Sequence, residues 1–127
     1  MRAAPPVRTQ GSPGGCAMGN IYRFIEPALL RMLHERGQSY GYELAEGISA
    51  YALSDSQVDR SALYRTLRTL EENGFVRSKW DTESTGPARR VYSLTKPGRE
   101  HLREWGQLME RLGGALLAFS LQVRTTL

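Results

Sequence analysis

The stretch from residue 58 to residue 94 constrains the fold of this chain more than any other, because it combines a helix with a ribbon. Asp59 is a suitable N-cap, since its carboxylate can accept hydrogen bonds from the free N–H groups of a first helical turn. Gly74 follows where a helix needs a left-handed stop. Between them, apolar residues recur at helical spacing, at Leu63, Leu67 and Leu70. The sequence therefore predicts an amphipathic helix over about 59–73.

The polar side chains of this predicted helix lie off its apolar stripe, with Tyr64 at the border. They suit contacts with phosphates or base edges in a major groove of DNA, and they are Arg60, Ser61, Tyr64, Arg65 and Arg68. The alternative is an ordinary solvated helix face, because arginine is common on helix surfaces. The helix alone does not decide between the two interpretations.

A two-stranded ribbon is predicted directly after the helix. Residues 75–80 and 89–94 are rich in aromatic and β-branched residues, which favour strands. Residues 81–87 between them are turn and loop formers. In the second strand, Tyr92 and Leu94 share a face that is expected to meet the helices.

Basic residues of the ribbon are the second group of predicted DNA contacts. Arg89 and Arg90 lie at the loop end and Lys79 lies on the first strand, so all three are expected to bind phosphates. Charged residues also protect strand edges, which is the alternative. The adjacent arginines after a basic helix favour phosphate contact. Residues 58–103 hold ten Lys and Arg against six Asp and Glu, an excess equal to the net charge of +4 of the whole chain.

The helix predicted over about 59–73 would be the recognition helix of a helix-turn-helix, and the segment before it is expected to supply the first helix of that motif. Residues 37–40 are expected to form a turn, and a helix is predicted over about 41–52. Tyr42 is expected to lie mainly in the core. For Tyr40 the sequence leaves two roles open. Its hydroxyl donates a hydrogen bond to a phosphate, or its ring packs in the core while the hydroxyl remains solvated.

The N-terminal part divides into a tail and a helix. Residues 1–18 are rich in Pro, Gly and small polar residues and are predicted to be a disordered tail that contains Cys16. A helical apolar stripe follows up to residue 36, with Pro27 in the first turn of the main helix. One cysteine excludes an internal disulfide and fits a reducing cytoplasm, so a cytoplasmic location is expected.

A long last helix is predicted after residue 95, with Thr95 as its cap and Pro97 in its first turn. Its apolar residues follow a strict 3-4 spacing, at Leu102, Trp105, Met109, Leu112, Leu116, Phe119 and Val123. A helix of about 25 residues would reach ~37 Å, too long to bury this seam on one small domain. The spacing favours pairing with a second copy of the chain, with an intrachain core helix as the alternative.

Four stretches of the chain resemble one known family. They are SYGYELAEGI at 39–48, SALYRTLRTLEENGFV at 61–76, GPARRVYSLTKPGREHL at 86–102, and the last helix. The sequence is similar to the PadR-like family of bacterial transcriptional regulators over about 20–120. The resemblance implies a winged-helix dimer that binds operator DNA, usually as a repressor. The family mostly has Ser-Pro-Gly-Thr before its Leu-Tyr, where this chain has Asp-Arg-Ser-Ala at 59–62.

The resemblance also implies residue roles at the dimer. In the family the N-terminal helix region crosses to the partner subunit, so Phe24 and Ile25 join the predicted interface with Leu102, Trp105, Met109, Leu112, Leu116 and Phe119. Some members bind small planar molecules against aromatic residues of the last helix. Trp105 and Met109 are the corresponding ligand contacts here, although plain packing in the seam is the favoured interpretation.

The sequence therefore predicts a mainly α protein with a small β-hairpin. Its expected parts are a tail at 1–18, a winged helix-turn-helix domain at 19–95 and a dimerisation helix at 96–127. The expected partners are double-stranded operator DNA, a second copy and a small aromatic effector. No catalytic, cofactor or metal constellation and no membrane-spanning run is found in the sequence. A protein-interaction adaptor on the same fold is the alternative function.

Overall fold

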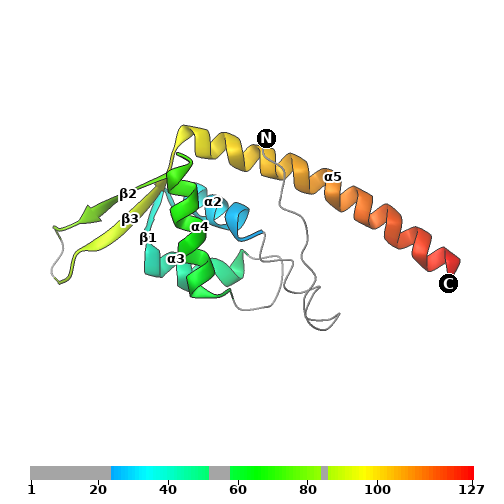
Figure 1. The fold of residues 1–127 in the computed structure, drawn as a ribbon, viewed down its shortest axis with the longest axis horizontal. Coiled ribbons are helices and arrows are strands. Elements are labelled where there is room, and N and C mark those ends of the chain that lie inside the picture. The colour runs from blue at the N-terminus through cyan, green and yellow to red at the C-terminus, as the bar shows by residue number, and fades with distance from the viewer. Residues whose placement is uncertain (1–23, 52–57, 84–85) are drawn as a thin grey trace.

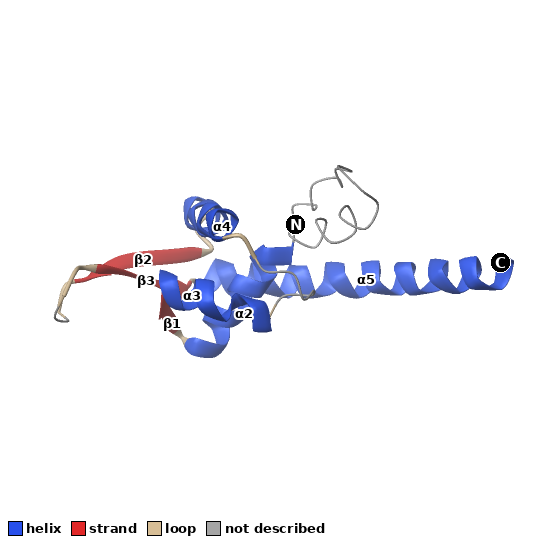
Figure 2. Ribbon diagram, turned by 90° about the horizontal axis from the view of Figure 1, so that it is seen from below, coloured by secondary structure: helices blue, strands red, loops and turns tan. Residues whose placement is uncertain are grey.

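The computed structural model of the chain describes residues 24–51, 58–83 and 86–127. A small helical body carries two extensions that leave it in opposite directions, as Figure 1 and Figure 2 show. One extension is a β-ribbon, and the other is the long C-terminal helix. The predicted tail and Cys16 lie outside the described residues. Among the described helices, none is both long and apolar enough to cross a membrane.

The body is built around α2, Ile25–Arg36, whose apolar residues are almost fully buried. The helix packs against α4, the sheet and α5. Short elements follow it: α3, Gly41–Gly47, and the 3-10 turn η2, Ile48–Ala50. The side chains that α2, α3, η2 and α4 bury together are Leu29, Leu30, Met32, Leu33, Leu44, Ile48, Leu63, Leu67 and Leu70. Removing this apolar area from water is the main stabilising contribution to the domain.

The prediction of one continuous helix over about 41–52 was wrong in its length. The α-helical part ends at Gly47, and the chain tightens into η2, which Tyr51 closes by donating its N–H to the Ile48 carbonyl at 3.0 Å. Glycine disfavours helix continuation because it keeps the most backbone freedom in the unfolded chain. The segment that joins η2 to α4 lies outside the described residues.

The sheet has three strands rather than the two predicted. The wing consists of β2, Val76–Asp81, and β3, Arg89–Leu94, paired antiparallel with their connecting loop. The third strand, β1, Gln38–Tyr40, pairs with the other edge of β3, where a turn was expected. Gly37, at φ 83°, allows the chain to leave α2 and enter β1 at once. Three residues are too few to show the alternation that identifies a strand in a sequence.

The helix α4, Arg60–Glu72, forms as predicted. The Asp59 side chain accepts from the Ala62 N–H at 3.2 Å, and Gly74 ends the turn at φ 81°. The Phe75 N–H donates to the Leu70 carbonyl at 2.9 Å, so β2 begins one residue later than expected. These caps fix both ends of α4 against the sheet.

The last helix, α5, covers Lys96–Thr126, which agrees with the predicted bounds of 96–127 and exceeds the 25 residues used to estimate its reach. The Thr95 hydroxyl accepts from the Gly98 N–H at 3.0 Å, which confirms the predicted cap. A Cβ at Gly98 would lie 2.0 Å from the Phe75 carbonyl oxygen, so only glycine allows α5 to start this close to β2. Gly113 and Gly114 lie within the helix without ending it, because nothing crowds them and the neighbouring residues are good helix formers.

Candidate nucleic-acid interface

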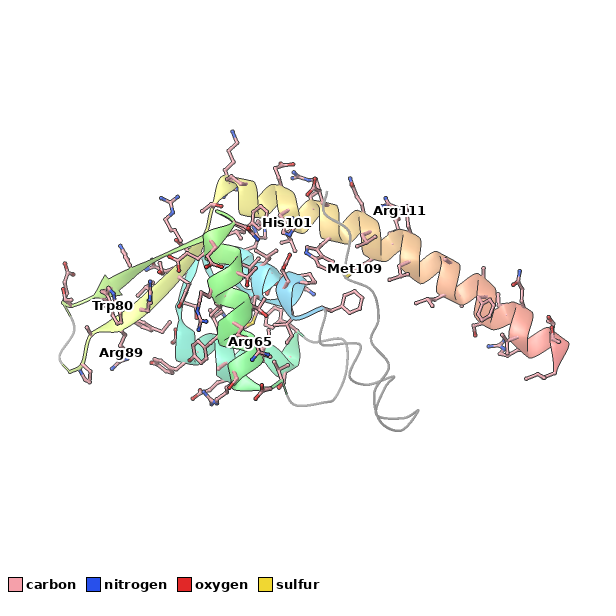
Figure 3. The ribbon with its side chains drawn as sticks, viewed as in Figure 1. Arg65, Trp80, Arg89, His101, Met109 and Arg111 are labelled. Carbon is pink, nitrogen blue, oxygen red and sulfur yellow. The ribbon has the colours of Figure 1, made fainter. Side chains whose placement is uncertain are left out.

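The outer face of α4 carries the basic side chains that the sequence predicted for it. Arg60, Ser61, Arg65 and Arg68 are all exposed, whereas the leucine stripe on the other side is fully buried. Figure 3 shows Arg65 and the wing residue Arg89 on the side of the domain that faces away from α5. The helix and wing therefore present positive charge on a common side.

Tyr64 is half-buried, as its border position suggested. Its ring lies against the first turn of α3, because a Cβ at Gly41 would meet Tyr64 Cε1 at 3.1 Å and Tyr92 Cε1 at 3.5 Å. Glycine at this position allows the two helices of the helix-turn-helix to approach closely. Tyr64 thus has a packing role within the domain beside any role toward DNA.

The wing has two faces, and its basic residues divide between them. Residues paired across β2 and β3 share a face, so the register places Arg89 and Lys79 on one side of the ribbon. Arg90 lies on the other side, paired with Trp80. Tyr92 and Leu94 also share this second face, and Tyr92 is buried against the helices as predicted. The three predicted phosphate contacts of the wing therefore do not form one group.

Arg89 lies against two tyrosines that come from β1 and α3. The rings of Tyr40 and Tyr42 stack with centroids 5.8 Å apart and planes 12° apart. The Arg89 guanidinium carbon lies 5.4 Å and 5.6 Å from these two centroids, and Nη1 donates to the Tyr42 hydroxyl at 3.1 Å. The stack and the arginine join the loop end of β3 to the start of α3.

The prediction that Tyr42 lies mainly in the core was wrong, since Tyr42 is 42% exposed. The apolar residues that α3 and η2 bury fully are Leu44 and Ile48. The Glu43 carboxylate accepts from the Tyr40 N–H at 3.0 Å, which fixes the start of α3 at Gly41. A glutamate three residues after a cap position is a recognised helix-start pattern, but it does not indicate the contact of Tyr42 with the wing, which joins positions 47 residues apart.

Arg90 is engaged with the body of the domain. Its Nε donates to the Ser78 hydroxyl at 2.9 Å, and its guanidinium lies 5.3 Å from the centroid of the Trp80 ring. The Ser78 hydroxyl in turn donates to the Glu71 carboxylate of α4 at 2.6 Å. These contacts hold the second face of the wing to the end of α4.

Two of the predicted interface residues are part of the protomer's own core. Ile25 and Trp105 are each 5% exposed, and Phe24 packs edge-on against Trp105 with ring centroids 5.9 Å apart. The Trp105 indole N–H donates to the Glu26 carboxylate at 2.8 Å. Trp105 therefore anchors α5 to α2 in a single chain. Of the other predicted contacts, Leu102 and Met109 are half-buried against the same core.

A buried histidine completes this anchor, and the sequence analysis had not predicted it. His101 Nε2 lies 2.5 Å from the same Glu26 oxygen, and its ring stacks on Phe75 with centroids 3.9 Å apart. The helical spacing of His101 and Trp105, four residues apart, was visible in the sequence. Their common acceptor was not, because Glu26 lies 75 residues before His101.

Among the residues that the structure describes, none covers the C-terminal part of α5. Every residue from 110 to 127 is exposed, and the exposed apolar residues of this part are Leu112, Leu116, Leu117, Phe119, Leu121, Val123 and Leu127. Exposed apolar surface of this extent marks an interaction site in a folded protein.

Comparison with protein families identifies residues 29–104 as a match to the transcriptional regulator PadR-like family. A "probable transcriptional regulator" of Mycobacterium tuberculosis is 33% identical over 78 residues. These residues are 61% of this chain but only 41% of that protein. The chain thus spans less than half the length of this relative.

Solved structures share the fold. A PadR family transcription regulator of Clostridium difficile superposes with a TM-score of 0.64 at 23% identity, covering 76% of this chain and 97% of that one. Bacillus subtilis PadR, solved in complex with operator DNA, has a TM-score of 0.56 at 24% identity, covering 65% of this chain and 46% of that one. The winged-helix architecture predicted from the sequence is confirmed by these likenesses.

Proposed function

Because the chain belongs to the PadR-like family of transcriptional regulators, which are not enzymes, we propose that it acts as a homodimeric repressor of its target promoter. Each protomer inserts α4 into a major groove of a near-palindromic operator, and each wing holds the flanking backbone. Such a regulator acts where the chromosome lies, so a cytoplasmic location is part of the proposal.

The exposed basic face of α4 is the observation that carries this proposal. Three arginines stand on that face over a fully buried leucine stripe, at Arg60, Arg65 and Arg68. Arginine binds guanine edges and phosphates through fixed, paired donors. Ser61 and Tyr64 complete the proposed contacts of the helix, and Arg89 and Lys79 add those of the wing. Arg90 is expected to contribute less to phosphate binding, since Ser78 and Trp80 already contact its guanidinium group.

The exposed end of α5 supports the homodimer. Leu112, Leu116 and Phe119 follow the 3-4 spacing of a helix–helix seam, and all three are exposed in the single chain. A second copy supplies an identical seam, which a two-fold interface requires. The two recognition helices of such a dimer would meet half-sites about 34–36 Å apart.

Fluorescence anisotropy tests DNA binding directly. The protein is titrated onto a labelled duplex of its own upstream promoter and onto a scrambled duplex of equal length, over a salt series. We expect tighter binding to the promoter and a steep loss of affinity with salt, because each phosphate contact releases counterions. Equal and weak binding to both duplexes would favour the adaptor alternative or an operator elsewhere.

A pair of arginine variants assigns the binding to α4. Arg65→Ala should weaken promoter binding by about 1–3 kcal/mol if Arg65 contacts a base edge. Arg111→Ala removes the same charge from α5, and Figure 3 shows Arg111 far from the wing and from α4. The control variant should bind almost as the wild type does. Equal losses in both variants would mean that only net charge matters.

The repressor activity and the effector complete the proposal and rest on the family. Loss of the protein should raise expression from the target promoter in a reporter strain. A small aromatic effector would release the DNA by favouring another spacing of the two recognition helices. Because Trp105 is closed within its own protomer, we expect such a ligand to pack against Met109 at the edge of the seam. Titration of the DNA complex with small aromatic acids tests this part.

A further inference from the structure

The two stacked tyrosines beside the wing have hydroxyl groups in different situations. The Tyr40 hydroxyl donates to the Asp81 carboxylate on β2 at 2.5 Å. This hydrogen bond raises the pKa of Tyr40 above its ordinary value, with partial burial as the second cause. The Tyr40 hydroxyl thus donates its hydrogen bond within the same chain and does not donate to a phosphate.

The Tyr42 hydroxyl has the opposite arrangement. It accepts a hydrogen bond from Arg89 Nη1 at 3.1 Å, and the residue is 42% exposed. A phenol that accepts still has its own proton to donate, and an arginine has five N–H donors. Tyr42 and Arg89 therefore present neighbouring donors at one point on the surface.

The surroundings fix the direction of the arginine. Its guanidinium lies over both tyrosine rings, within 5.6 Å of each centroid. Stacking of this kind favours the weakly hydrated guanidinium. It also reduces the side-chain freedom that binding would otherwise remove. The cluster is thus organised before any anion arrives.

We propose that the Tyr42 hydroxyl and the Arg89 guanidinium together form one binding site for a phosphate of the DNA backbone, with Tyr40 and Asp81 as positioning residues. The site lies where the loop end of β3 meets the start of α3, apart from the face of α4. This assignment rests on the proposed DNA binding and deepens it, since it gives the phosphate contact to Tyr42, which was expected in the core, and not to Tyr40, for which the sequence left both roles open. It adds affinity without sequence preference, because a phosphate is the same at every step.

Two conservative variants separate the roles of the tyrosines. Tyr42→Phe keeps the ring under Arg89 and removes only the hydroxyl, and Tyr40→Phe does the same for its partner. Promoter and scrambled duplexes are titrated by anisotropy over a salt series, and the melting temperature of each variant is measured to check its fold. Tyr42→Phe should weaken binding to both duplexes by about tenfold, as expected for a hydrogen bond to a charged group. Tyr40→Phe should change affinity by less than about twofold, the range of ordinary surface substitutions.

The Arg89→Ala variant completes a double-mutant cycle. It should lower the dependence of log affinity on log salt by about 0.9, the value for one phosphate contact, whereas Tyr42→Phe should leave that slope unchanged. The double variant should lose less than the product of the two single losses, because both groups bind one phosphate.

The possible failures are distinguishable. If the wild type binds neither duplex, the proposed DNA binding is wrong, and the phosphate site that depends on it is wrong as well. If the wild type binds and Tyr42→Phe binds equally well, only the phosphate site is wrong. If Tyr40→Phe loses more affinity than Tyr42→Phe, or the losses of Tyr42→Phe and Arg89→Ala multiply, the assignment of roles is overturned.

Discussion

The two halves of α5 share one sequence pattern, but the first half is packed against the body of the domain and the second half is exposed. In the first half, residues 96–109, the apolar seam turns toward α2, and Trp105 is almost fully buried. In the second half, residues 110–126, the seam continues at the same spacing, the described part of the chain leaves it uncovered, and Leu116 is 61% exposed. We call these the anchored half and the free half.

The difference shows what spacing alone specifies. A 3-4 pattern states that one face of a helix is apolar, but the partner of that face depends on the length of the remaining structure. The small body can cover about half of a helix that extends over about 46 Å. The anchored half therefore stabilises the fold, and the free half is left for assembly.

The largest expected effect tests the anchored half. Trp105→Ala should destabilise the fold by about 3–5 kcal/mol, the usual cost of removing a buried tryptophan. Denaturant unfolding, at protein concentrations low enough to keep the chain monomeric, measures this change. Phe119→Ala, in the free half, should stay within about 0.5 kcal/mol under the same conditions. Similar losses in both variants would abolish the distinction between the halves.

The next effect tests the free half. Leu116→Asp should weaken dimerisation at least about 100-fold, or about 3 kcal/mol, because it places a charge in both copies of a helix seam. Leu117→Asp is a matched control, since Leu117 is equally exposed but lies off the 3-4 seam. Sedimentation equilibrium should show a dimer for the control and a monomer for Leu116→Asp. Dissociation of both variants would mean that pairing is not confined to the seam.

A smaller effect concerns the polar part of the anchor. Glu26→Ala should cost about 1–3 kcal/mol, because the donors of Trp105 and His101 lose their common, partly buried acceptor. Thermal unfolding in the Leu116→Asp background measures this cost without a contribution from assembly. Glu110→Ala, on the exposed free half, serves as the control, and an equal change there would contradict a special role for Glu26.

The smallest effect sharpens the comparison within the free half. Gly114→Ala should stabilise α5 by up to about 1 kcal/mol, since alanine is the better helix former and nothing lies within 4 Å of the added Cβ. Circular dichroism over a temperature series in the Leu116→Asp background should show a helix that frays less. A fall in dimer affinity for Gly114→Ala in the wild-type background would instead show that the partner approaches this glycine closely.

Much of the fold followed from local patterns in the sequence. The Asp59 and Thr95 caps, the leucine stripe of α4 and the extent of β3 were all predicted, because each depends on residues within one or two turns. The third strand was missed, since Gln38–Tyr40 is too short to alternate visibly. Its formation depends on β3, which lies more than 50 residues later.

The candidate site was predictable in composition but not in grouping. Periodicity placed the arginines of α4 on the exposed face, and this placement holds in the structure. The adjacency of Arg89 and Arg90 suggested one joint contact, yet the pleat of a strand sends neighbouring side chains to opposite faces. The contact of Arg89 with Tyr42 joins positions 47 residues apart, which no local pattern indicates.

The stoichiometry of the DNA complex tests the central claim most directly. Sedimentation or native mass measurement on the purified complex counts the chains bound to one promoter duplex, for the wild type and for Leu116→Asp. If two chains pair through the free half, we expect two chains per duplex for the wild type and one weakly bound chain per half-site for the variant. A wild-type complex with a single chain, of the same affinity as the variant, would contradict assembly through α5.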